Sequence, residues 1–203
     1  MTARECFSAA AEGFVAVVAS LDRSDWDRPG LGEWTVRDLV GHTSRALSTI
    51  ETYLAHPSPD VALRAPLDYL LAARGPFVDP AAIARRGREA GAALGDNPLA
   101  AVGDLATRVT ALVATTPDDA TLTIASGRGM TLIAYLPTRT LELTVHTLDL
   151  AEAVHLDPPA VLAAPVMASV ELVASAAGRG PDASAVLLAL AGRRGLPEGF
   201  SVV

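Results

Sequence analysis

The chain has 203 residues, half of them hydrophobic, which is long enough for one domain with a full core. Ala, Leu and Val carry the hydrophobic excess and aromatic residues make up only 4%, so closely packed helices are favoured over an aromatic-rich β-sandwich. The formal net charge of −7 excludes a broad surface for nucleic acid or anionic lipid, because both partners require a basic patch.

The single cysteine, Cys6, excludes an intramolecular disulfide and a sulfur-rich metal cluster, and it is expected to be a packing residue. Charged residues interrupt the apolar start of the chain, which is unlike the core of a signal peptide. The most apolar later stretch, about residues 161 to 177, contains Pro165 and Glu171 and is expected to be too interrupted to span a bilayer. We therefore expect a cytoplasmic protein that binds neither membrane nor nucleic acid.

The first predicted helix covers about residues 3 to 21, where apolar side chains recur at helical spacing. A polar connection follows and ends at Thr35, whose hydroxyl can cap a second helix running to about residue 54. Asp38, three residues later, completes a capping box with Asp in place of the usual Glu. The sequence therefore predicts a sharp start for the second helix.

The middle of the chain contains shorter elements. Residues 56 to 60 predict a loop, and residues 66 to 73 predict a short helical turn. Asp79-Pro80 and Asn97-Pro98 each place a capping side chain before a proline, which predicts helices over about 80 to 94 and 98 to 115. The segment TLTIASGRGMTLIAY then predicts a small β-hairpin, because β-branched residues flank its Gly-rich centre.

Pro137 is expected to start a helix that reaches about His155 and ends before a pair of prolines. Two further helices are predicted over about 160 to 176 and 182 to 192, followed by an extended tail. The prediction is an all-α fold. Residues 1 to 157 would form a helix bundle, and residues 158 to 203 a C-terminal helical extension packed on it.

The helix expected from Pro137 carries two polar stripes when it is drawn at about 100° per residue. One stripe consists of threonines and is expected to face water: Thr140, Thr144 and Thr147. The other stripe is charged, spans about 80° of arc, and lies in the middle of the apolar face: Arg139, Glu142, His146 and Asp149. Burying these charges without partners would cost several kcal/mol each, so a divalent cation is a natural partner.

Glu142 and His146, at positions i and i+4, point at one locus and can bind the same metal ion. His42, on the margin of the buried face of the second helix, is the third candidate ligand. A His, Glu, His set leaves one coordination position open, as catalytic zinc sites do. Asp149 could orient a ligand imidazole, and Arg139 could balance charge or hold an anionic substrate, so both are candidate catalytic residues.

Simpler interpretations stay open. A Glu and a His four residues apart occur often by chance, and Arg139 with Glu142 could form a salt bridge inside a purely structural bundle. Zinc suits the mixed ligands, but nickel, iron and manganese tolerate the same set. Trp34 is expected to pack the entrance of the bundle; alternatively it stacks on a bound cofactor or substrate. His56 and His155 are expected on the surface.

Two segments, EWTVRDLVGHTSRAL at 33 to 47 and LPTRTLELTVHTLDLAEAV at 136 to 154, resemble the mycothiol-dependent maleylpyruvate isomerase family. The second segment looks like the family's R-x-x-E-x-x-x-H-x-x-D-L-A signature, and the closing LLALAGRRGLPEGFSVV is similar to a tail of shorter members. The resemblance implies a DinB-like four-helix bundle with metal ligands at His42, Glu142 and His146. Its core would be the helices at 3 to 21, 35 to 54, 98 to 115 and 137 to 155.

The resemblance also implies a metal-dependent enzyme, acting as a monomer or homodimer, that uses the thiol of mycothiol as nucleophile or cofactor. Thiol transfer to a small electrophile, or its isomerisation, would be the reaction, with Zn²⁺ as the metal and Ni²⁺ as the alternative. The full isomerases carry a second α/β domain, and only a short segment follows His155, so isomerisation of maleylpyruvate itself is not expected. Leu148 stands where many relatives have tryptophan. The competing function is a non-catalytic module, for ligand binding or stress response, that holds a metal.

Overall fold

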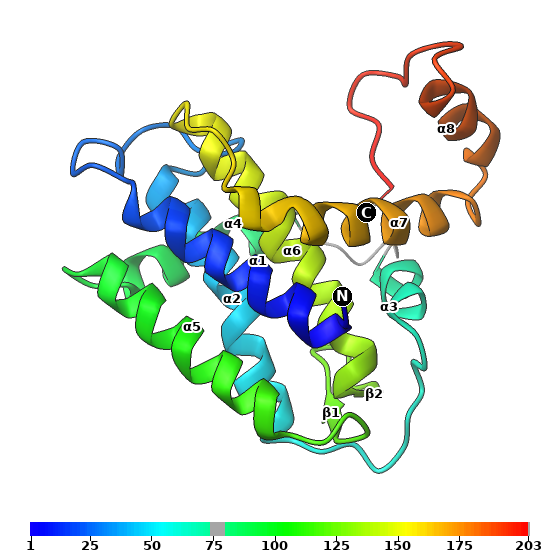
Figure 1. Ribbon diagram of the computed structural model, residues 1–203, viewed down its shortest axis with the longest axis horizontal. Coiled ribbons are helices and arrows are strands. Elements are labelled where there is room, and N and C mark those ends of the chain that lie inside the picture. The colour runs from blue at the N-terminus through cyan, green and yellow to red at the C-terminus, as the bar shows by residue number, and fades with distance from the viewer. Residues whose placement is uncertain (74–79, 203) are drawn as a thin grey trace.

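The computed structural model describes residues 1–73 and 80–202, and its centre is a bundle of four long helices (Figure 1). These helices are α1 (Ala3–Ala19), α2 (Val36–Leu54), α5 (Pro98–Thr115) and α6 (Leu132–Ala153). Helices α1 and α2 each pack against both α5 and α6. The predicted all-α fold and the four predicted core helices are therefore confirmed.

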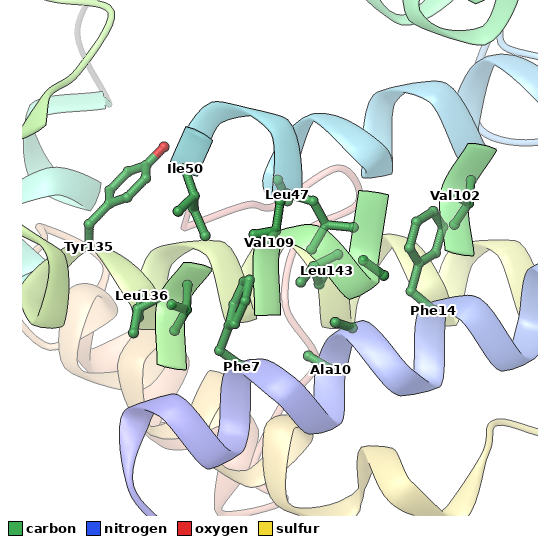
Figure 2. Packing of buried hydrophobic residues seen from close by; sticks show 14 of the residues in the cluster. Phe7, Ala10, Phe14, Leu47, Ile50, Val102, Val109, Tyr135, Leu136 and Leu143 are labelled. Atoms are coloured by element: carbon green, nitrogen blue, oxygen red, sulfur yellow. The ribbon is translucent and has the colours of Figure 1, made fainter. Parts of the chain in front are cut away.

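Side chains from all four helices meet in the core (Figure 2). The labelled core residues include Phe7 and Phe14 of α1, Leu47 and Ile50 of α2, Val102 and Val109 of α5, and Leu136 and Leu143 of α6. Each of these side chains is fully buried. Because the core extends along both α2 and α6, it fixes how the polar residues of these two helices face each other.

The predicted capping residues begin their helices as expected. Thr35 accepts a hydrogen bond from the backbone N–H of Asp38 at 3.2 Å, and the Asp38 carboxylate accepts one from the N–H of Thr35 at 3.1 Å. The Asn97 side chain likewise accepts a hydrogen bond from the first turn of α5. The predicted Asp79 cap lies outside the described residues, although the helix it would precede, α4 (Pro80–Ala93), is described.

The predicted hairpin is also confirmed, as strands β1 (Thr121–Thr123) and β2 (Gly129–Thr131). The strands are antiparallel and pair Leu122 with Met130, two residues that are both fully buried. Gly129 lies so close to the loop before α3 (Pro66–Ala73) that a Cβ there would fall 2.0 Å from the carbonyl oxygen of Asp60. The hairpin thus closes one end of the bundle.

The predicted start of α6 is wrong, because the helix begins at Leu132 and Pro137 lies inside it. The first two amides of α6 are satisfied from outside the helix. Leu132 N–H donates to the Ala120 carbonyl at 2.8 Å, and Ile133 N–H donates to the Asp118 carbonyl at 3.1 Å. The loop before β1 therefore caps the helix, and Pro137 removes only one backbone donor from it.

The threonine stripe of α6 is buried, so the prediction that it faces water is wrong. Thr140, Thr144 and Thr147 are all at most 2% exposed. Helix α1 and helix α7 (Ala163–Ala177) pack against α6, while α2 and α3 cover other parts of it, which leaves little of its surface to water. Each hydroxyl donates to the backbone carbonyl four residues earlier in α6, so burial leaves none of them unpaired.

The C-terminal segment contains a 3₁₀ turn (Ala160–Leu162), α7 and α8 (Ala183–Leu190). Helix α7 lies against α1, α3 and α6, whereas α8 stands away from the bundle (Figure 1). The helix predicted over about 160 to 176 is confirmed, with Pro165 and Glu171 inside α7. The expectation that these two residues make the segment too interrupted to span a bilayer does not hold by length and composition. By length and composition alone, the 18 residues Ala160–Ala177, with a mean hydropathy of 1.8, are apolar enough to cross a membrane. The proposed boundary after residue 157 stays a prediction.

Candidate metal centre

The packing of α2 against α6 brings His42 next to Glu142 and His146, about a hundred positions later in the chain. The candidate ligand atoms of these three side chains all lie within 4.8 Å of one another. The two imidazole rings are nearly perpendicular, with centroids 4.8 Å apart, and His146 Nε2 lies 3.5 Å from Glu142 Oε2. The three candidate ligands predicted from the sequence therefore form one cluster.

The chemistry of this cluster fits a divalent cation. Two imidazole nitrogens and one carboxylate oxygen are ligands that zinc accepts at about 2.0–2.2 Å, which requires ligand atoms roughly 3.4 Å apart. The donors here lie within 4.8 Å of one another, so the widest possible gap exceeds that spacing by about 1.4 Å. In addition, His42 Nδ1 is buried and has no hydrogen-bond partner among the described residues. Since an unpaired buried polar atom costs about 1–3 kcal/mol, these residues could hold a metal ion.

Burial governs the protonation of His42. Burial, assisted by the neighbouring charge of His146, lowers the pKa of His42 to about 4 against the opposing effect of Glu142. The imidazole of His42 is therefore neutral at physiological pH. A neutral imidazole keeps a lone pair that can bind a metal.

Glu142 and His146 behave in the opposite way because they face each other. Burial would lower the pKa of His146, but hydrogen bonds to Asp149 and Glu142 outweigh it and raise the pKa to about 9. Burial would raise the pKa of Glu142, but the hydrogen bond to His146 and the charge of Arg139 lower it to about 2. A proton on His146 thus occupies the position where a metal would bind. The Glu142 side chain is 37% exposed, so the cluster borders solvent.

Asp149 holds the second nitrogen of His146. Its Oδ2 lies 3.0 Å from His146 Nδ1, one helical turn along α6. Because Nδ1 donates its proton to Asp149, Nε2 is directed at Glu142, and a metal could bind there in place of the Nε2 proton. This is the position in which an orienting carboxylate was predicted.

Arg139 is buried, but it does not pair with Glu142. Its guanidinium carbon lies 4.7 Å from the ring centroid of Tyr135 and 5.2 Å from that of Tyr69. Its Nε donates to Thr138, and one of its terminal nitrogens donates to the Tyr69 hydroxyl at 3.1 Å. No ion pair joins Arg139 to Glu142 in the described part of the chain, so the salt-bridge interpretation of this pair is wrong. The two tyrosines hold the cation in place through their rings.

Trp34, in the loop before α2, packs between His42 and α4. The ring centroids of Trp34 and His42 lie 4.4 Å apart, and the indole N–H donates to the Ala84 carbonyl at 3.0 Å. Gly87 faces this ring, and a Cβ at Gly87 would lie 2.6 Å from it. Trp34 is only 8% exposed, so it packs the bundle as expected. Cofactor binding by Trp34 stays a prediction.

Several parts of this surrounding were not predicted. No sequence pattern predicted that Tyr69 contacts Arg139, because its short helix α3 lies far from Arg139 in the sequence. The close approach of α4 to α2 could have been predicted, because the α4 glycines at 87 and 91 are four residues apart and so share one face of the helix. Gly91 packs against Gly41 of α2. A Cβ added at Gly41 would lie 2.1 Å from the Gly91 backbone nitrogen. His56 and His155 are exposed and Cys6 is buried, as predicted.

These features define a helical bundle with a candidate His, Glu, His metal centre between α2 and α6. The family model of the mycothiol maleylpyruvate isomerase N-terminal domain matches residues 7–151. The chain therefore belongs to this family, whose domain is a DinB-like helical fold. The match runs from α1 into the last turn of α6 and includes all three candidate ligands. Comparison with curated proteins and with solved structures finds no match.

Proposed function

We propose that this protein is a metal-dependent enzyme that uses a low-molecular-weight thiol, mycothiol, as nucleophile or cofactor. It would act on a small electrophile as a thiol transferase or as a cis-trans isomerase. The observation that carries the proposal is the cluster of His42, Glu142 and His146, with ligand atoms within 4.8 Å and an orphan buried nitrogen on His42. The family name supplies the identity of the thiol.

In this proposal His42 and His146 each bind the metal through a ring nitrogen, and Glu142 binds it through its carboxylate. Zn²⁺ is the first candidate and Ni²⁺ the second, because both accept this mixed set. Three protein ligands leave a coordination position open for an external thiol. A bound metal would lower the pKa of that thiol, so that the nucleophilic thiolate exists at neutral pH.

The remaining side chains would orient and stabilise the reacting groups. Asp149 keeps the proton of His146 on Nδ1, which holds Nε2 as the ligand atom. Arg139 adds a permanent positive charge one turn from Glu142, which favours a thiolate or an anionic substrate nearby. Trp34 would form the wall of the thiol site beside His42. We further propose that the protein works in the cytoplasm, as a monomer or homodimer.

The competing function is a non-catalytic module that retains a metal and a small ligand. The matching family model is that of a domain, and such a metal-holding domain can bind a small ligand without turning it over. The two candidates share the metal centre and differ in turnover.

The experiment uses the zinc-loaded full chain, mycothiol and a panel of small electrophiles, with adduct formation followed by mass spectrometry. We expect adducts that require the metal and that disappear in His42→Ala and after chelation. His155→Asn is the matched control, because the His155 side chain is exposed and lies beyond the last residue of α6, past the candidate metal ligands. Its backbone has a positive φ of 59°, a conformation that Asn tolerates. Full metal occupancy without turnover of any electrophile in the panel would contradict the proposal of an enzyme. Tight retention of mycothiol in that case would support the non-catalytic binding module.

A further inference from the structure

A second cavity lies on another side of α6, between α7 and the C-terminal segment. Its volume is about 410 Å³, within the roughly 300–1,000 Å³ of small-molecule sites. Its walls include Val145 and Leu148 of α6, Val170 and Val173 of α7, and Leu190 and Phe200 of the C-terminal segment. We call this cavity the C-terminal cleft. Among the residues that the structure describes, no charged side chain lines it.

The walls of the C-terminal cleft expose apolar side chains to water. Val145 is 39% exposed, Val170 is 57% exposed and Leu190 is 72% exposed. Helix α8 contains no buried residue, and the tail after it returns to lie beside α7 (Figure 1). Water in contact with facing apolar walls is unfavourable, so an apolar molecule between them would be stabilised by displacing it.

We propose that the C-terminal cleft is a binding site for one uncharged, apolar small molecule. The absence of charged lining residues disfavours an ionic ligand, because its charge would lose water without gaining a partner. The size disfavours a protein partner. A helix with its side chains is about 10 Å wide, so roughly one turn would fill the cavity, which is too little for a docked helix.

The C-terminal cleft is separate from the metal centre, although both use α6. Val145 precedes His146 and Leu141 precedes Glu142, so each cleft residue points about 100° away from the neighbouring candidate ligand. None of the three candidate ligands lines the cleft. The proposed ligand therefore binds without contacting the metal, and it is not the electrophile or the thiol of the proposed function.

The test is a fluorescence titration of the full-length, zinc-loaded chain with N-phenyl-1-naphthylamine, an uncharged apolar probe. We expect saturable binding of one probe per chain. Val170→Asp and Leu190→Asp place a carboxylate in the cleft at exposed positions, so folding is preserved while binding weakens at least about tenfold. Zinc content should be the same in both variants as in the unaltered protein.

Matched controls lie on the same two helices. Met167 of α7 and Leu187 of α8 are 62% and 67% exposed and do not line the cleft. Met167→Asp and Leu187→Asp should leave the affinity for the probe within about twofold of the starting value. Equal weakening in the controls would identify a broad apolar surface instead of a site. That result, binding without saturation, or one probe per two chains in a dimer would each overturn the proposal.

Discussion

Two polar stripes run along α6, and both are largely shielded from water, yet they are satisfied in different ways. The hydroxyls of the threonine stripe donate to carbonyls of their own helix. In the charged stripe, His146 pairs with Glu142 and Asp149 of the same helix. His42, which faces this stripe from α2, keeps a buried nitrogen without a partner in the described chain. Burial of polar groups is therefore not a mark of function by itself. What distinguishes the metal centre is an unpaired buried nitrogen on His42 beside two further candidate ligands.

His146→Ala breaks the charged stripe most severely. It removes one of three proposed ligands, so we expect the affinity for zinc to fall by more than about 100-fold, beyond the loss typical of an outer partner. Competition with a chromophoric chelator measures the change. His155→Asn should leave the affinity unaltered, and near-normal zinc binding by His146→Ala would show that the stripe is structural.

Asp149→Asn sharpens the comparison by removing a charge and keeping an acceptor. Asn can still accept the hydrogen bond from His146 Nδ1, but it no longer makes the imidazole more basic. We expect zinc affinity to fall about tenfold, at the low end for outer-shell partners. The same chelator competition measures this loss, with Glu152→Gln, an exposed residue of α6, as the control. An unchanged affinity would mean that Asp149 does not act on the metal through His146.

Thr144→Val tests the other stripe and should have the smallest effect. Val matches the shape of Thr, and the Thr140 carbonyl keeps its backbone hydrogen bond from residue 144. We expect the free energy of unfolding in urea to change by less than about 1 kcal/mol and zinc affinity to stay the same. A tenfold loss of zinc affinity would contradict the distinction between the two stripes.

Local patterns predicted much of this molecule. Thr35 with Asp38, and Asn97 before Pro98, specify helix starts within a few residues, so their signals are readable without the fold. The spacing of Glu142 and His146 likewise follows from one helix. The start of α6 was not predictable in this way, because the carbonyls of Asp118 and Ala120 reach its first amides from a loop.

Residues that depend on packing between distant segments were harder to predict. The threonine stripe looked solvent-exposed because the positions of α1 and α7 around α6 do not follow from the pattern of α6 alone. The Tyr69 ring beside Arg139 comes from α3, about 70 positions earlier. His42 was identified because it lies on the margin of an apolar face, but its distance from Glu142 is a property of the bundle.

The most direct test of the metal centre is elemental analysis of the purified full-length protein, compared with His42→Ala. The variant removes the imidazole with the unpaired nitrogen and leaves the ion pair of Glu142 and His146 in place. We predict one equivalent of a divalent metal, zinc first, per unaltered chain and almost none in His42→Ala. A metal-free native protein, or a variant that keeps one equivalent, would contradict the account.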